Sequence, residues 1–207
     1  MLTPTATHPG PARTRVSWSH RRADSARYRL ACEYSRPPQA RGEARRFLTT
    51  VLMTDIVDST VVASRLGDRA WCDVLADHYA ACRAEVNRNG GDLVNTTGDG
   101  IVAIFDAPGS AVRAAIAIQG VSLASGIELR AGLHTGECER LDDGVAGITV
   151  HIAARVCALG CGDAVMTTGT VRDLASGSRL AFEPRGDHRL KGVPGRWMVF
   201  SATDLAV

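Results

Sequence analysis

Two aspartates stand in short stretches where a carboxylate could do chemistry. Asp99 lies between two glycines in "NTTGDGIVAIF" (residues 95–105), and the tolerance of glycine for positive φ suits the tight hairpin turn predicted here. Asp55 opens "DIVDST" (residues 55–60), directly after an apolar, β-branched run. Taken alone, Asp99 could serve the turn and Asp55 could cap a helix. A metal-binding or catalytic role depends on whether the fold brings them together.

The periodicity of the surrounding chain predicts such a fold. We expect strands and helices in the order β-α-β-β-α-β, at about 47–54, 68–88, 92–97, 101–105, 110–124 and 128–134. This order is typical of ferredoxin-like folds, so we predict an α+β fold with a βαββαβ core and a C-terminal extension. In such a sheet the first and third strands are antiparallel neighbours. Asp55 and Asp99 should therefore lie close together at one edge.

Three further local features are expected. Asp68 follows a glycine and could cap the long helix, which should end at Asn89-Gly90-Gly91. A glycine-rich loop is expected at 136–147. A further helix, with Ile152 and Val156 on one face, and short strands should follow it.

Two neighbouring carboxylates repel each other unless a cation lies between them. Mg²⁺ and Mn²⁺ favour carboxylate oxygen, and two such ions about 4 Å apart can clamp an in-line displacement at phosphorus. The turn at 56–60 leads from a strand into a helix, where backbone N–H groups can bind a polyphosphate. The sequence has no GxxxxGK[ST] loop, which excludes a P-loop enzyme.

Five motifs, in order, resemble those of class III adenylate and guanylate cyclase catalytic domains: "FLTTVLMTDIVDST", "NTTGDGIVAIF", "LRAGLHTGE", "GITVHIAARV" and "HRLKGVPG". The resemblance covers nearly all of 47–206, and "HIAARV" is similar to bacterial, mycobacterial-like adenylate cyclases. It implies an enzyme that converts ATP to 3′,5′-cyclic AMP and pyrophosphate. It also implies a head-to-tail homodimer with two active sites at the interface.

The resemblance assigns roles around the metals. Asp55, Asp99 and the Ile56 carbonyl would bind two Mg²⁺ or Mn²⁺ ions per active site, which lower the pKa of the ribose 3′-hydroxyl. That oxygen would attack the α-phosphorus. Arg155 would stabilise charge on the α-phosphoryl group, to which a planar, permanently charged guanidinium is suited. Residues that would bind the substrate phosphates are Asp58, Ser59, Thr60 and Lys191, the last being the only lysine of the chain.

Three positions depart from the family pattern. Asn95 stands where most adenylate cyclases have a lysine that reads adenine, and a neutral donor should weaken purine discrimination about tenfold. The second purine-reading aspartate falls on Gly144, so we assign that role to the neighbouring Asp143. His151 replaces the asparagine that orients the ribose, and an imidazole could donate a hydrogen bond there.

Two alternatives remain open. Guanylate cyclase is the nearest, although the glutamate and cysteine expected for guanine recognition are not at the corresponding positions. The changed residues at 95, 144 and 151 also allow a weakly active or non-catalytic nucleotide-binding homologue that acts as a dimerisation partner. Asp55, Asp99, Arg155 and Lys191 argue against it, because chemistry needs them and dimerisation does not.

Composition divides the chain in two. Residues 1–46 hold ten arginines against three acidic residues, and the rest holds 14 basic against 19 acidic residues. We predict a disordered basic extension at 1–46 and a catalytic domain at 47–207. No run of 18 apolar residues is present, so we expect no membrane span, and we expect no nucleic-acid partner. Six cysteines without a CxxC pair predict reduced thiols and a cytoplasmic protein.

Overall fold

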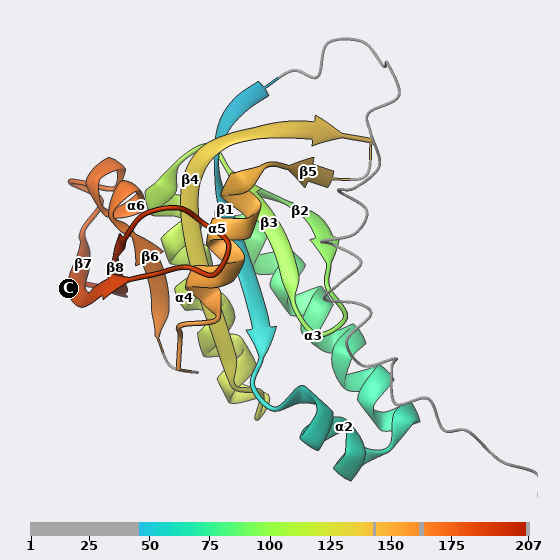
Figure 1. Ribbon diagram of the computed structural model, residues 1–207. Coiled ribbons are helices and arrows are strands. Elements are labelled where there is room, and N and C mark those ends of the chain that lie inside the picture. Colours follow the sequence, from blue (N-terminus) through green and yellow to red (C-terminus); the bar gives the residue numbers. More distant parts are fainter. Residues whose placement is uncertain (1–45, 143, 162–163, 206–207) are drawn as a thin grey trace, which may run out of the picture. The chain divides into compact units, whose positions relative to one another are not determined.

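The computed structural model describes residues 46–142, 144–161 and 164–205 (Figure 1). The predicted extension, apart from Arg46, and the predicted purine reader Asp143 lie outside the described residues. An eight-stranded sheet has the order β2-β3-β1-β4-β6-β8-β7, with β5 paired to β4. The strands are β1 (Arg46–Ile56), β2 (Gly91–Thr96), β3 (Ile101–Phe105), β4 (Leu129–Leu141), β5 (Gly144–Ala146), β6 (Val165–Thr168), β7 (Leu180–His188) and β8 (Trp197–Asp204).

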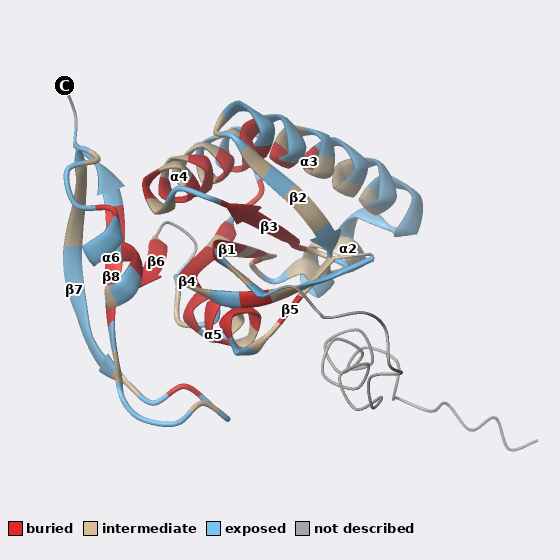
Figure 2. Cartoon of the chain, turned by 90° about the horizontal axis from the view of Figure 1, so that it is seen from above, coloured by how far each residue is buried: buried red, intermediate tan, exposed pale blue. Residues whose placement is uncertain are grey.

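The predicted α+β core is confirmed. The first four predicted strands form the β2-β3-β1-β4 part of the sheet, and β1 pairs with both β3 and β4 in antiparallel register. The helices are α2 (Ser59–Leu66), α3 (Asp68–Arg88), α4 (Pro108–Ala124), α5 (Ile148–Cys157) and α6 (Gly169–Leu174). Helices α3 and α4 lie on one face of the sheet and α5 on the other (Figure 2). The sheet is thus covered on both sides around β1.

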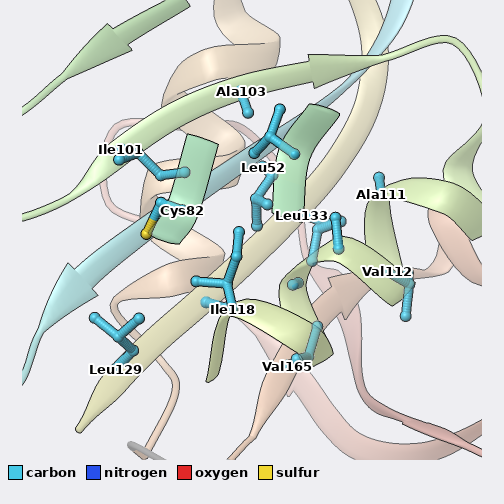
Figure 3. Packing of buried hydrophobic residues seen from close by; sticks show 14 of the residues in the cluster. Leu52, Cys82, Ile101, Ala103, Ala111, Val112, Ile118, Leu129, Leu133 and Val165 are labelled. Carbon is cyan, nitrogen blue, oxygen red and sulfur yellow. The ribbon is translucent and has the colours of Figure 1, made fainter. Parts of the chain in front are cut away.

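Alternation along the central strands divides the core between these two layers, because successive side chains of a strand point to opposite faces. Leu52 and Ile101 pack with Ile118 of α4 on one face (Figure 3). Val51 and Val102 pack with α5 side chains on the other face. Strand β3 is therefore apolar on both sides, and β1 largely so. The buried Thr49 and Thr50 inside β1 are hydrogen-bonded, Thr49 to the Phe105 carbonyl and Thr50 to the Thr135 hydroxyl.

Two predictions about local structure are wrong. The glycine-rich segment at 136–147 is not a loop: β4 continues to Leu141 and β5 returns beside it. Pairing with the long strand β1 extends β4, since the ladder runs out to the pair Arg46 and Glu139. Asp68 is not the cap of α3, because Gly67 occupies the N-cap position and Asp68 is the first helical residue.

Candidate active site

The end of β1 turns sharply into α2. The Val57 N–H donates to the Glu128 carbonyl at 2.9 Å, which ends the strand at Ile56. Asp58 then adopts a left-handed conformation with φ 51°. Its carbonyl accepts from the N–H groups of Val61 and Val62 at 2.8 and 3.1 Å, so the first turn of α2 begins directly after it. Helix α2 has no buried residue, and its N-terminus lies beside the end of β1.

The hairpin between β2 and β3 carries Asp99 at its tip. The Thr97 N–H donates to the Gly100 carbonyl at 2.8 Å, and Gly98 has the positive φ of 88° that the turn needs. The Tyr79 hydroxyl of α3 donates to the Gly98 carbonyl at 2.8 Å. Burial first, and then the negative charge of Asp99, raises the pKa of Tyr79, so this hydroxyl stays protonated and can donate.

The hairpin tip packs against the end of β1. The β1–β3 register pairs Met53 with Val102, and the same register continued outward sets Asp55 opposite Gly100. Gly100 lies so close to the Thr54 backbone that a Cβ there would overlap the Thr54 carbonyl. The Ile101 N–H also donates to the Thr54 hydroxyl at 3.1 Å. The structure thus brings the two predicted metal ligands to the same edge of the sheet.

Side-chain contacts then link this edge to its neighbours. The Ser59 hydroxyl, at the start of α2, donates to Asp99 Oδ2 at 2.5 Å. Arg130 Nη2 lies 2.9 Å from Asp55 Oδ2, with side chains 28% and 23% exposed respectively. Sequence reasoning missed Arg130. Arg130 lies directly opposite Asp55 in the β1–β4 pairing, and this register is what brings the two side chains together.

A second set of predicted residues meets at the end of α5. Arg155 Nε donates to the Lys191 carbonyl at 3.1 Å, and both side chains are exposed. His151 lies one turn earlier on α5 and is half-buried. The helix is held close to the sheet because Gly132 of β4 has no side chain; a Cβ there would overlap the Cys157 backbone. The segment before Lys191 is anchored by Leu190, which packs with Ile152 and Val156.

Asn95 lies on β2, beside the irregularity in the β2–β3 pairing between Leu93 and Asn95. Its side chain is exposed, and its Oδ1 accepts from the Thr96 N–H at 2.7 Å. This contact fixes which way the amide faces, because the oxygen is engaged by the backbone. The amide nitrogen is then the group left to donate to a ligand.

Two of the predicted phosphate-binding residues are exposed to solvent. Asp58 lies in the turn before α2, and Thr60 lies in the first turn of α2.

A sequence model of the adenylate and guanylate cyclase catalytic domain matches residues 45–202. The chain belongs to this family. Among solved structures, this cyclase domain is similar to the adenylyl cyclase CyaB from P. aeruginosa, with a TM-score of 0.68 and 19% identity over 78% of this chain and 96% of that one. It is also similar to the guanylate cyclase domain of RhGC from Catenaria anguillulae in complex with GTP, with a TM-score of 0.70, 22% identity and coverage of 78% and 99%. Such neighbours show the shared fold and do not distinguish ATP from GTP.

Curated relatives of the cyclase domain come from mycobacteria. The uncharacterised protein Rv0891c of Mycobacterium tuberculosis is 33% identical over 150 residues, which is 70% of this chain and 52% of that protein. The uncharacterised protein Rv2212 of the same organism is 29% identical over 153 residues, 72% of this chain and 40% of that protein. The chain spans about half the length, or less, of these relatives.

The oxygen donors of the cyclase domain fit a divalent cation of the Mg²⁺ type. Among the described residues, no group of three or more His, Cys, Asp or Glu side chains converges on one point. Asp55 and Asp99 would therefore supply two carboxylates at most, with the Ile56 carbonyl beside them. Mg²⁺ is commonly held in this way, by one or two carboxylates with substrate phosphates and water completing the octahedron. None of the helices in the described part is both long and apolar enough to cross a membrane.

Proposed function

We propose that this chain is an adenylate cyclase that converts ATP to 3′,5′-cyclic AMP and pyrophosphate. The observation that carries the proposal is the meeting of two strand ends, where Asp55 and Asp99 lie at one edge of the sheet beside the N-terminus of α2. Carboxylates and free helix N–H groups are the two kinds of group that a metal-bound triphosphate needs.

The residues at this edge of the sheet bind the metal ions and the substrate phosphates in the proposed reaction. Asp55, Asp99 and the Ile56 carbonyl would hold two Mg²⁺ or Mn²⁺ ions, and ions bound there would acidify the ribose 3′-hydroxyl and neutralise charge on the triphosphate. The turn through Asp58 and the first residues of α2, Ser59 and Thr60, binds phosphate oxygens through backbone N–H groups. The 3′-oxygen attacks the α-phosphorus in line with the departing pyrophosphate. The bond between the α-phosphorus and the oxygen that bridges it to the β-phosphate breaks, pyrophosphate leaves, and the proton of the 3′-hydroxyl passes to solvent.

The second set of residues acts on the same reaction from the partner copy of a head-to-tail homodimer. Arg155 stabilises negative charge that develops on the α-phosphoryl oxygens, because a planar guanidinium can donate two parallel hydrogen bonds to phosphate oxygens. Lys191 binds the terminal phosphates, and His151 donates a hydrogen bond to the ribose. Contact between Arg155 and the Lys191 backbone supports a joint role for these two residues.

Asn95 and Asp143 are the residues that we assign to the purine base. Asn95 offers amide N–H donors, and both adenine N1 and guanine O6 are acceptors, so Asn95 alone does not discriminate strongly. Asp143 is assigned to the exocyclic amino group of adenine, which is a donor. Guanylate cyclase is therefore the second candidate function, and the Asn95 amide is the observation that favours it.

None of the five described cysteines forms a disulfide. This agrees with the reducing cytoplasm, which is the compartment that we propose.

The test is formation of cyclic nucleotide by the purified full chain with Mn²⁺, from ATP and from GTP in parallel. We expect the wild type to form cyclic AMP from ATP. In Asp55→Asn, kcat/KM should be at least about 100-fold lower. Mutation of a residue that only supports a metal ligand costs about 10–100-fold, and loss of the ligand itself should cost more. Asp173→Asn, on the exposed part of α6, is the matched control and should be fully active. Production of cyclic GMP alone would favour the second candidate. Absence of both products would leave a non-catalytic dimerisation partner.

A further inference from the structure

We propose that Ser59 is a positioning residue for Asp99. Its hydroxyl donates to Asp99 Oδ2 at 2.5 Å, across 40 positions of the chain, and both residues are half-buried. The inference rests on the proposed function, because it concerns how Asp99 is prepared to bind a divalent cation.

The hairpin fixes the backbone of Asp99 but not its side chain. Tyr79 holds the Gly98 carbonyl on one side of the tip. On the other side, Gly100 packs on the Thr54 carbonyl. Neither contact touches the carboxylate, whose rotamer would otherwise be set only by rotation about its own bonds. The hydrogen bond from Ser59 supplies that constraint.

The chemistry of the contact suits this role. A hydroxyl that donates to a carboxylate makes a short, charge-assisted hydrogen bond, about twice as strong as a neutral one. It uses one of about four lone-pair sites of the carboxylate, so Asp99 keeps the capacity to bind a cation. Holding a ligand in a single rotamer removes part of the ordering cost that cation binding would otherwise carry.

Ser59 also connects the proposed phosphate-binding turn at α2 with the proposed metal ligand Asp99. It is the first residue of α2, directly after the left-handed Asp58, and α2 has no buried residue to anchor it. The bond to Asp99 therefore ties the N-terminus of α2, the proposed phosphate site, to the metal ligand. A hydroxyl has one hydrogen, and here it is given to Asp99. Phosphate contacts at Ser59 then come from the backbone N–H rather than from the side chain.

The test uses Ser59→Ala and Ser59→Thr in the full chain. Mn²⁺ binding is measured without nucleotide, from the electron paramagnetic resonance signal of free Mn²⁺, together with the unfolding midpoint. We expect Ser59→Ala to weaken Mn²⁺ binding about 10–100-fold, as for other partners of metal ligands, at an unchanged midpoint. Ser59→Thr retains the hydroxyl and should restore most of the affinity. In cyclase assays of Ser59→Ala the Mn²⁺ concentration for half-maximal rate should rise.

Ser64→Ala is the matched control. Ser64 lies on the same helix, and its hydroxyl donates at 2.8 Å to the Thr60 carbonyl within α2, so its loss should leave Mn²⁺ binding unchanged. Wild-type affinity in Ser59→Ala would overturn the inference, as would a loss that Ser59→Thr does not restore. If Asp55→Asn and Asp99→Asn also bind Mn²⁺ like the wild type, the proposed metal site itself fails. If those two variants lose Mn²⁺ and Ser59→Ala does not, only the role of Ser59 fails.

Discussion

Arg130 and Asp55 form an ion pair at the edge of the sheet where β1 ends, with Arg130 Nη2 2.9 Å from Asp55 Oδ2. The two residues face each other across the β1–β4 pairing, so the sheet itself sets their distance. Both side chains are mostly covered, at 28% and 23% exposed, and solvent screens such a pair less than it screens a surface pair. Arg130 thus supplies the positive charge that Asp55 faces before any metal binds.

Replacing Arg130 should therefore destabilise the fold in a metal-dependent way. Arg130→Met leaves the Asp55 carboxylate without this counter-charge, and we expect a loss of about 1–3 kcal/mol in the free energy of unfolding by urea. Saturating Mn²⁺ should reduce that loss, because the cation replaces the missing charge. Arg196→Met breaks an exposed pair with Asp187 and should cost less than about 1 kcal/mol, with no Mn²⁺ dependence. If Arg130→Met loses the same free energy of unfolding with and without Mn²⁺, the metal does not bind beside the Asp55 carboxylate where the guanidinium lies.

Mixing of inactive variants tests the division of the active site between two copies. Asp99→Ala and Arg155→Ala should each be inactive, but a heterodimer of the two retains one cleft with both residues intact. An equimolar mixture that exchanges freely should then recover about a quarter of wild-type activity, from the statistics of a two-fold symmetric dimer. Asp99→Ala mixed with Asp55→Ala is the control. Those two residues lie at one site of one chain, so no intact cleft can form and activity should not return.

Purine selectivity should respond to the residue at position 95. Asn95→Lys replaces a neutral donor by a charged one, which strengthens a hydrogen bond from roughly 0.5–1.5 to 1.5–3 kcal/mol. We expect the ratio of kcat/KM for ATP over GTP to rise about tenfold, because lysine is the residue that reads adenine at this position in most adenylate cyclases that the sequence resembles. Both kcat/KM values are measured on the same preparation. Asp92→Asn, an exposed change on the same strand, serves as the control for effects of charge on β2. An unchanged ratio would remove Asn95 from the purine site.

The close approach of β4 and α5 gives a prediction about stability. Gly132→Ala would place a Cβ on the Cys157 backbone, and overpacking of this kind costs about 1–3 kcal/mol. Activity should fall as well, because α5 carries His151 and Arg155. Gly120→Ala is the matched control: it lies inside α4 with nothing near its Cβ position, and alanine there should stabilise by about 0.5–1 kcal/mol. Thermal melts of both variants provide the measurement.

The sequence predicted the parts of the fold that periodicity controls. The apolar alternation of β1 and β3 and the ferredoxin-like order were sufficient to bring Asp55 and Asp99 to one edge. Local composition failed where long-range pairing decides the structure. Glycines at 136–147 predicted a loop, whereas partners on β1 hold Gly136 and Glu137 in the strand β4. Arg130 was missed for the same reason, because its role depends on a register that no local pattern reveals.

His134 should make the stability of the domain depend on pH. It is buried on β4, where Nδ1 lies 2.8 Å from the Thr168 hydroxyl and the ring meets Trp197 edge to face. Burial lowers the pKa of His134 from 6.5 to about 4. The unfolded chain therefore binds a proton between these values that the folded chain does not, so stability falls as pH falls through this window. From pH 7 to pH 4.5 the free energy of unfolding should fall by roughly 2–3 kcal/mol because of His134.

The test is urea unfolding of His134→Gln, whose free energy of unfolding should fall less over the same pH range. The buried His78, whose pKa is also lowered, contributes equally to both proteins. Identical pH profiles for wild type and variant would show that His134 is not held neutral by burial.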